Sequence, residues 1–238
     1  MKSEKAISGE GPLVLVSGGN RGIGFEACRA LAERGARVLL GARRIEDGEK
    51  AAGRLAKSGA VTAVALDVAD AGSVAALAGR VAREHGALDV LVNNAGVYLD
   101  GDASVATVAE DTIERTVATN LYGPWRLSRA FAPGMAKRGR GRIVNVSSGM
   151  GALSSMGANA PSYRVTKAAL NALTLVLAAE FKAAGVGVIS FCPGWVATDM
   201  GGAGAPRSPK DAGEELAAAA LEDERSGVFI REGREIPW

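Results

Sequence analysis

Apolar residues follow two patterns along this chain, short continuous runs and repeats at helical spacing. Short continuous apolar runs such as Leu13–Val16 end at glycine or polar residues, which is typical of strands buried on both faces of a parallel sheet. Between these runs, apolar residues recur at helical spacing, as with Val74, Leu77 and Val81 after the cap residue Asp70. The pattern predicts strands at residues 13–16, 37–41, 61–66, 88–93, 142–146, 186–191 and 227–230.

The intervening segments predict helices from Ile23 to a cap near Gly35, over 46–57, after Asp70, over 111–137, from Tyr163 to about 182, and after Ser208-Pro209. Strict alternation of strand and helix implies right-handed crossovers and a parallel sheet covered on both faces. No linker divides residues 1–238, which begin with a short polar tail at 1–11. The sequence therefore predicts a single-domain Rossmann fold, an α/β doubly wound parallel sheet that binds ligands at the carboxyl ends of its strands.

Composition and charge narrow the class of protein. Hydrophobic residues make up 47% of the 238 residues and charged residues 23%, which excludes wholesale disorder. The net charge of +2 gives no reason to expect nucleic acid as a partner, and no apolar run reaches the roughly 18 residues that span a bilayer. The N-terminus has no export signal, and Cys28 and Cys192 are the only cysteines. We therefore expect a cytoplasmic protein without a membrane partner or a bound metal.

A glycine-rich loop from Ser17 to Gly24 joins the first strand to the first helix. Gly18 permits a sharp turn, Gly22 lets a pyrophosphate approach the backbone, and Gly24 lets helix and strand pack closely. The spacing is one residue longer than the common dinucleotide fingerprint, and a glycine-rich turn without a ligand is the alternative. We expect a dinucleotide to contact this loop at Gly18, Asn20, Arg21, Gly22, Ile23 and Gly24.

The end of the second strand distinguishes the two nicotinamide cofactors. An NAD site usually places a carboxylate there, whereas an NADP site places an arginine for the 2′-phosphate. This chain has Arg43 and Arg44 at that position, without an acid, and Arg21 adds positive charge nearby. Each arginine alone is compatible with a solvated surface charge. Together they favour NADP(H), bound through Arg43.

Tyr163 and Lys167 are one helical turn apart. Residues at i and i+4 share a helix face, so the phenol and the ammonium can point into the same volume. A phenol has a pKa of about 10, and a neighbouring positive charge lowers it toward the working range. The pair predicts an acid/base centre, although an ordinary exposed helix face would carry the same spacing.

Several motifs, in order, resemble those of the short-chain dehydrogenase/reductase family over nearly the whole chain. Beside the glycine loop they are Leu66-Asp67-Val68, Asn93-Asn94-Ala95-Gly96, Asn120, Asn145-Val146-Ser147-Ser148, Tyr163-x-x-x-Lys167 and Pro193-Gly194. Within the family, the segment from Cys192 to Met200 and the terminal Trp238 are most similar to NADPH-dependent carbonyl reductases. The resemblance implies an oxidoreductase that reversibly reduces a small hydrophobic ketone or aldehyde by hydride transfer.

The resemblance also implies a role for each matching residue. The expected cofactor contacts are Asp67 and Val68 at the adenine, Asn94, Ala95 and Gly96 at the ribose, and Pro193, Gly194, Val196 and Thr198 at the nicotinamide. In the expected catalytic set, Ser148 binds the substrate oxygen and Tyr163 gives it a proton. Lys167 lowers the Tyr163 pKa and holds the nicotinamide ribose, and Asn120 holds a water. Ser147 and Ser148 point to opposite sides of a strand, and the family pattern selects Ser148.

Asn120 also has support from the sequence itself. Pro124 lies one helical turn later and has no N–H, so it cannot bond to the carbonyl of Asn120. That carbonyl is then free to hold a water, and the helix predicted over 111–137 should kink there. A kink that serves only packing is the alternative.

The substrate and the partners are less constrained. We expect an apolar pocket from Met150, Leu153, Met156, Trp195 and Met200, with residues 201–209 as a mobile lid, although a methionine is also a common core filler. Small residues on the Tyr163 helix favour a homodimer or homotetramer over packing within one subunit. Basic residues from Arg126 to Arg142 leave open a 3-ketoacyl-thioester reductase. A non-catalytic NADP-sensing regulator is the alternative from another class.

Overall fold

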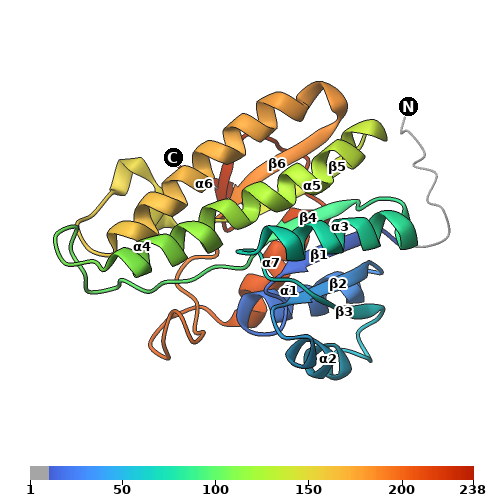
Figure 1. Cartoon of the computed structure of the whole chain (residues 1–238), viewed down its shortest axis with the longest axis horizontal. Helices are drawn as coiled ribbons and strands as arrows, with labels where there is room; N and C mark the ends of the chain where they lie inside the picture. The colour runs from blue at the N-terminus through green and yellow to red at the C-terminus, as the bar shows by residue number, and fades with distance from the viewer. Residues whose placement is uncertain (1–10) are drawn as a thin grey trace.

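The computed structural model describes residues 11–238, which form one sheet flanked by helices (Figure 1). Its strands are β1 Leu13–Ser17, β2 Arg37–Ala42, β3 Val61–Ala65, β4 Val90–Asn93, β5 Gly141–Val146, β6 Val186–Phe191, β7 Phe229–Arg231 and β8 Arg234–Glu235. Its helices are α1 Gly22–Glu33, α2 Ile45–Arg54, α3 Ala71–His85, α4 Glu110–Val117, α5 Gly123–Lys137, α6 Pro161–Phe181 and α7 Pro209–Leu221. The predicted polar tail, apart from its last residue, lies outside the described residues.

The sheet has the strand order β3-β2-β1-β4-β5-β6-β7-β8. Every neighbouring pair is parallel except β7 and β8. The predicted doubly wound parallel sheet with helices on both faces is therefore confirmed. The order of the strands reverses between β1 and β4, so their carboxyl ends form the crevice in which such sheets bind ligands.

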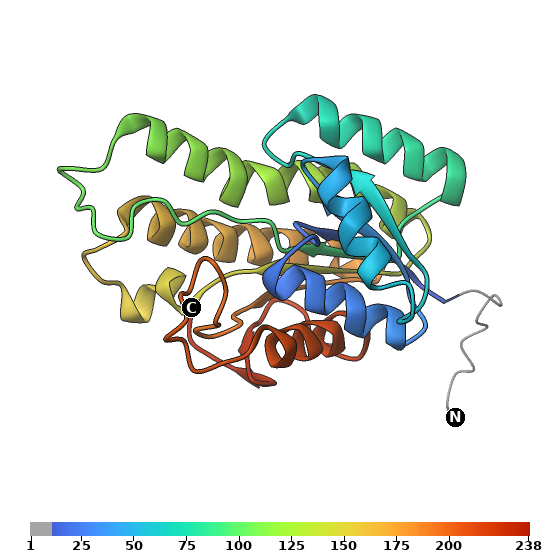
Figure 2. The same cartoon turned by 90° about the horizontal axis from the view of Figure 1, so that it is seen from below.

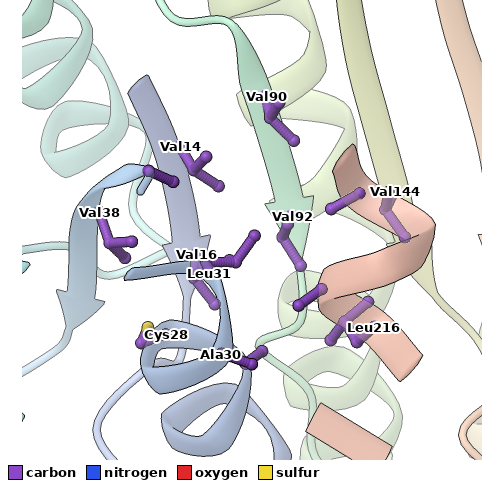
Figure 3. Close-up of a cluster of buried hydrophobic side chains, with 14 of the residues drawn as sticks. Val14, Val16, Cys28, Ala30, Leu31, Val38, Val90, Val92, Val144 and Leu216 are labelled. Atoms are coloured by element: carbon purple, nitrogen blue, oxygen red, sulfur yellow. The ribbon is translucent and has the colours of Figure 1, made fainter. Parts of the chain in front are cut away.

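Successive residues of each central strand pack on opposite faces. Val14 and Val16 of β1 belong to a core shared with α1, α2 and α7, whereas Leu13 and Leu15 belong to a core shared with α3, α5 and α6. Figure 2 shows α1 and α7 on one side of the sheet and α3 and α5 on the other. Figure 3 shows the first core, where Leu216 of α7 approaches the sheet beside α1. Burial on both faces accounts for the continuous apolar runs of these strands.

Several predicted caps and ends are confirmed. The side chain of Asp70 accepts hydrogen bonds from the Gly72 and Ser73 N–H groups at the start of α3, and Ser208 accepts from the Asp211 N–H at the start of α7. Gly35 follows α1 with a φ of 82°, a left-handed conformation that glycine adopts without strain. These local signals place the helix ends independently of tertiary packing.

The helix predicted over 111–137 is interrupted where a kink was expected. Residues Ala118–Tyr122 form a π-helical turn between α4 and α5, and the N–H of Gly123 donates to the carbonyl of Ala118, five positions back. Pro124 has no N–H, so the regular helical ladder cannot continue through this point. The structure therefore has two helices and a bulge in place of one kinked helix.

The C-terminal end of the sheet differs from the prediction. The last predicted strand exists as β7, but the chain then turns back as β8, which pairs antiparallel through Ile230 and Glu235. The segment is short and polar, so its sequence carries no alternating signal. No helix in the described part of the chain has the length and hydropathy needed to cross a bilayer.

Candidate active site

The glycine-rich loop lies at the carboxyl end of β1. Gly18 and Gly22 have positive φ values of 66° and 55°, a region that only glycine enters freely. No side chain within residues 11–238 caps the N-terminus of α1, so the backbone N–H groups of its first turn can serve an anion. The loop thus has the turn and the uncapped helix end that fit the pyrophosphate of a dinucleotide.

The loop is fixed to the neighbouring strand end by Ser17 and Asn94. The Ser17 hydroxyl accepts hydrogen bonds from the N–H groups of Asn94 and Ala95, at 3.0 and 3.1 Å, and donates to the Val92 carbonyl. The Asn94 amide donates to the carbonyls of Ser17 and Gly18, at 2.9 and 3.1 Å. The side-chain amide of Asn94, a residue expected at the ribose, therefore donates its hydrogen bonds to the glycine loop and fixes the conformation of that loop.

The glycine loop packs closely against Gly24 at the start of α1. A Cβ atom on Gly24 would lie 2.3 Å from the Gly18 carbonyl oxygen and 2.4 Å from the Asn94 amide nitrogen. Gly24→Ala should therefore displace the loop, weaken cofactor binding and lower stability by about 1–3 kcal/mol. Thermal unfolding and NADPH titration measure both effects. Gly53→Ala is the matched control because a Cβ there meets nothing within 4 Å; equal effects at both sites would contradict the packing role.

The expected cofactor-selecting arginine lies at the end of β2. Arg43 is exposed and has no ion-pair partner among the residues that the structure describes, whereas Arg44 faces Glu46 and Asp47 in the first turn of α2. Arg21 lies on the glycine loop and makes an exposed ion pair with Asp199 at 2.6 Å. Arg43 is therefore the cation available to a phosphate at this strand end.

Two further groups of expected cofactor residues also lie at strand ends. Asp67 follows β3 and accepts from the Ala69 N–H, and Val68 is buried against Gly123 at the start of α5. The segment after β6 contains the residues expected at the nicotinamide. An isolated β-bridge between Val196 and Arg207 joins the two ends of this segment. The Arg207 guanidinium donates to the Pro193 carbonyl at 2.6 Å and to Glu215 of α7 at 2.7 Å.

Residues 193–199, which follow β6, contact the glycine loop. The Thr198 methyl group lies 3.3 Å from the position of a Cβ on Gly22, and the ion pair of Arg21 with Asp199 joins the same two segments. Gly194 has a φ of 76° beside the Arg207 side chain. The structure therefore gathers the glycine loop and residues 193–199 at one edge of the sheet.

The catalytic candidates Tyr163 and Lys167 lie on the buried face of α6. Tyr163 is 8% exposed and Lys167 is 4% exposed. The Lys167 ammonium donates to the Val146 carbonyl at 2.8 Å and lies 5.7 Å from the centre of the Tyr163 ring. The pair is thus held together inside the protein rather than on an exposed helix face.

Burial dominates the ionisation of both groups. It raises the pKa of Tyr163 to about 12, an effect that the hydrogen bond from Ser148 only partly offsets. Burial also lowers the pKa of Lys167 to about 8. The expectation that Lys167 brings the Tyr163 pKa below its usual value is wrong for this structure, because lost hydration of a buried phenolate outweighs the nearby charge. Tyr163 therefore keeps its proton at neutral pH.

The two serines after β5 point to different partners. The Ser148 side chain accepts from the Met150 N–H at 3.1 Å, and its hydroxyl is close enough to the phenol to lower the pKa of Tyr163. The Ser147 hydroxyl, which is buried, faces the backbone carbonyl of Lys167 at 3.4 Å. Ser148 is thus the serine beside the phenol.

Asn120 lies in the π-helical turn and is fully buried. Its side-chain carbonyl accepts from the Val97 N–H at 2.8 Å, and its amide donates to the Val97 carbonyl at 2.9 Å. A Cβ on Gly96 would lie 3.4 Å from the Asn120 oxygen and 3.6 Å from the Lys167 nitrogen. The side chains of Asn120 and Lys167 therefore both approach Gly96.

The expected substrate residues are spread more widely. Met150 lies two residues after Ser148, and Met156, Trp195 and Met200 are exposed apolar side chains on the flanking loops. Leu153 instead lines a cavity of about 100 Å³ with Trp238 and the α6 residues Ala168, Ala172 and Leu175. That face of α6 carries neither Tyr163 nor Lys167. Leu153 lies in a short 3₁₀ turn, Leu153–Ser155, and its place in the substrate pocket stays a prediction.

Sequence reasoning missed a chain of buried polar residues behind the site. Asn93 donates to Asn145, Asn145 donates to Thr174, and Thr174 shares a hydrogen bond with Ser190, which donates to Asn171. These contacts link β4, β5, β6 and α6 under the catalytic candidates. Polar residues at the ends of otherwise apolar strands were the available signal. Tyr98 and Asp100, which contact the start of α6, were also missed.

Known proteins share this arrangement. The family model for short chain dehydrogenases matches residues 12–207. The chain is 39% identical over 191 residues to galactitol 2-dehydrogenase (L-tagatose-forming) of Cereibacter sphaeroides, covering 80% of this chain and 74% of that protein. It is 36% identical over 191 residues to a 3-oxoacyl-(acyl-carrier-protein) reductase of Vibrio cholerae, covering 80% and 76%.

A solved structure extends the similarity over nearly the whole fold. NADPH-bound carbonyl reductase from chicken fatty liver superposes with a TM-score of 0.86 and 28% identity, covering 96% of this chain and 100% of that chain. The match of the family model covers most of the chain and includes every catalytic candidate. The chain therefore belongs to the short chain dehydrogenase family of oxidoreductases.

Proposed function

We propose that this protein is an NADPH-dependent reductase of the carbonyl group of small hydrophobic ketones or aldehydes, acting reversibly. The observation that carries the proposal is the buried phenol of Tyr163, whose pKa Ser148 lowers and whose ring lies 5.7 Å from the ammonium of Lys167. A protonated phenol next to a second hydroxyl suits the donation of a proton to a carbonyl oxygen. The similarity to an NADPH-bound carbonyl reductase supports the same cofactor and reaction.

The proposed chemistry divides between the cofactor and the side chains. NADPH supplies the hydride when bound. Ser148 donates a hydrogen bond that holds the substrate oxygen, and Tyr163 transfers its phenolic proton to that oxygen as an alcohol forms. Lys167 stabilises the negative charge left on the phenol. Asn120, in the π-helical turn, would hold a water through which a proton returns to the site. Burial of Tyr163, Lys167 and Asn120 limits the access of bulk water to these transfers.

The proposed cofactor site uses residues at five strand ends, those of β1, β2, β3, β4 and β6. Gly18, Gly22 and Gly24 would hold the pyrophosphate on the uncapped N-terminus of α1. Arg43, with no ion-pair partner in residues 11–238, would bind the 2′-phosphate of NADP(H). The remaining proposed contacts are Asn20, Arg21, Ile23, Asp67, Val68, Asn94, Ala95, Gly96, Tyr163, Lys167, Pro193, Gly194, Val196 and Thr198.

A 3-ketoacyl-thioester reductase is the second candidate, because a relative carries that activity. The basic patch expected to dock a carrier is weaker than the sequence suggested. Arg142 is buried and donates to the Arg225 carbonyl, and Arg126 donates to the Ala69 carbonyl. Arg138 donates to the Leu88 carbonyl. These engaged arginines favour a small free substrate over a carrier-bound one.

A substrate panel tests the proposal directly. Ketones, aldehydes and acyl thioesters are offered with NADPH, and cofactor consumption is followed for each. We expect the highest kcat/KM with hydrophobic ketones or aldehydes. A preference for thioesters would favour the second candidate, and no turnover of any carbonyl would favour a non-catalytic regulator that senses NADP.

We further propose that the protein forms a homodimer or homotetramer through α5 and α6, which lie side by side in Figure 1. Val165 and Val176 are 64% and 59% exposed and lie about three turns apart on α6, and Trp125 of α5 is 52% exposed. Exposed apolar groups on adjacent helices are typical of an interface. The loop residues expected to act as a lid, 201–209, take no part in this surface.

Val176→Glu should convert the oligomer to a monomer, because a charge would be buried at the contact. Light scattering coupled to size exclusion measures the change. Val105→Glu is the matched control, since Val105 is 80% exposed on a loop away from both helices. A wild-type protein that is already monomeric would contradict the proposed interface.

A further inference from the structure

Helix α6, which carries Tyr163, begins without a capping side chain of its own. Its N-cap residue, Ala160, has a φ of 53° and no polar side chain. Pro161 follows and has no N–H, so the first free donors of the helix are the N–H groups of Ser162 and Tyr163. The start of this helix therefore depends on an acceptor from elsewhere in the chain.

Asp100 supplies that acceptor from a loop 62 residues earlier in the sequence. Its Oδ2 accepts the Ser162 N–H at 2.7 Å and the Ser162 hydroxyl at 2.5 Å, with the Tyr163 N–H farther away at 3.4 Å. A carboxylate is favourable at a helix N-terminus, where the helix dipole is positive. The first turn of α6 is thus held by a group that does not belong to it.

The burial of Asp100 is costly. The residue is 4% exposed, and its second oxygen, Oδ1, has no hydrogen-bond partner among residues 11–238. An unsatisfied buried polar atom is destabilising, so part of the stabilisation that Asp100 gives the start of α6 is offset by its own burial. This cost suggests a role that a local cap would not fulfil.

The segment Val97–Asp100 also contacts both ends of the catalytic set. The backbone of Val97 makes two hydrogen bonds with the Asn120 side chain. The Tyr98 ring packs edge-on against the Tyr163 ring, with centroids 4.8 Å apart and planes at 82°. One short segment therefore sets Asn120, the Tyr163 ring and the start of α6 relative to one another.

We propose that Asp100 is a positioning residue for proton transfer by Tyr163: it holds the first turn of α6 so that the phenol stays within reach of Ser148 and the substrate oxygen. The inference rests on the proposed function, because Asp100 performs no chemistry of its own. A displacement of about 1 Å at a reacting group lowers a rate by about 100-fold, so loosening this turn should be visible in kcat.

Three variants test the proposal. In Asp100→Ala, kcat should fall by about 100-fold while the dissociation constant for NADPH stays unchanged, since the contacts of Asp100 are to α6 and not to the glycine loop. In Asp100→Asn, an oxygen still accepts from Ser162, so kcat should stay within about 10-fold of the wild type. Asp102→Ala is the matched control, because Asp102 is exposed on the same loop.

The pH profile separates positioning from a general loss of stability. Burial raises the Tyr163 pKa, so a looser first turn that admits water should move the alkaline limb of the kcat profile to lower pH. A protein that is only less stable keeps the wild-type limb. If Asp100→Ala does not fold, Ser162→Ala carries the same measurement, because it removes the hydroxyl that donates to Asp100 at 2.5 Å, and an unmoved limb there refutes the role.

Two results would overturn the proposal: a wild-type kcat in Asp100→Ala, or an equal loss in Asp100→Asn and Asp100→Ala. Tyr163→Phe in the same assay distinguishes this failure from that of the proposed function. Full turnover in Tyr163→Phe refutes the reaction itself. Loss of turnover in Tyr163→Phe with normal turnover in Asp100→Ala refutes only the role of Asp100.

Discussion

Tyr163→Phe should lower kcat for carbonyl reduction by about 100- to 10,000-fold, the usual contribution of a positioned proton donor. The variant keeps the ring and so keeps the edge-on contact with Tyr98, but it loses the hydroxyl proposed as the proton donor. NADPH affinity should change little, because a ring in the same place still borders the crevice. Steady-state kinetics and a fluorescence titration with NADPH measure the two effects separately.

The matched control for that variant is Tyr122→Phe. Tyr122 ends the π-helical turn and is 49% exposed, so its hydroxyl is available to water rather than to the catalytic candidates. Thermal unfolding of both variants shows whether the fold is kept, since a lost buried hydrogen bond costs about 1 kcal/mol. Near-normal turnover in Tyr163→Phe would mean that another group supplies the proton.

Arg43→Asp should shift the cofactor preference from NADPH toward NADH. The variant removes the proposed charge-assisted bond to the 2′-phosphate and places a carboxylate against that phosphate. The same carboxylate is offered to the ribose hydroxyls of NADH. Losing one such bond costs about 1.5–3 kcal/mol, so with repulsion the ratio of kcat/KM for the two cofactors should change by about 100-fold or more.

Lys50→Asp provides the matched control for the change of charge. Lys50 is exposed on α2, close in sequence to Arg43 but within the helix rather than at the strand end. A general electrostatic effect would alter the ratio equally in both variants, whereas a contact with the phosphate would alter it only in Arg43→Asp. An unchanged ratio in Arg43→Asp would remove the basis for NADP selectivity at this strand end.

The central sheet was predictable because its strands are buried on both faces, and such strands must be continuously apolar. The antiparallel β8 was not predictable, since its residues Arg234 and Glu235 are exposed and carry no periodic pattern. Pro124 indicated a break in the ladder through Asn120, but one residue cannot specify whether the chain kinks or forms a π-helical turn. The missing N–H of Pro124 located the break in the helix, and tertiary contacts determined that the break is a π-helical turn.

The candidate site divides in the same way. Tyr163, Lys167, Ser148 and the glycine loop belong to short motifs, so their positions could be inferred before the structure was known. Asp100 could not be inferred, because its importance arises from hydrogen bonds to residues 62 positions away. The Tyr163 pKa was predicted with the wrong sign for a related reason: spacing reveals a neighbouring charge, but burial depends on the whole fold.

The hydrogen bonds from Asn94 and Ser17 determine when the cofactor loop becomes ordered. Both residues tie the loop to the end of a central strand in the protein alone, so its conformational entropy is lost during folding. A dinucleotide then meets a rigid receptor and gives up little of its binding free energy to arrange it. Substitutions at Asn94 should therefore lower the affinity for the cofactor, because the unliganded loop would become more flexible. This effect does not require a direct contact between Asn94 and the ligand.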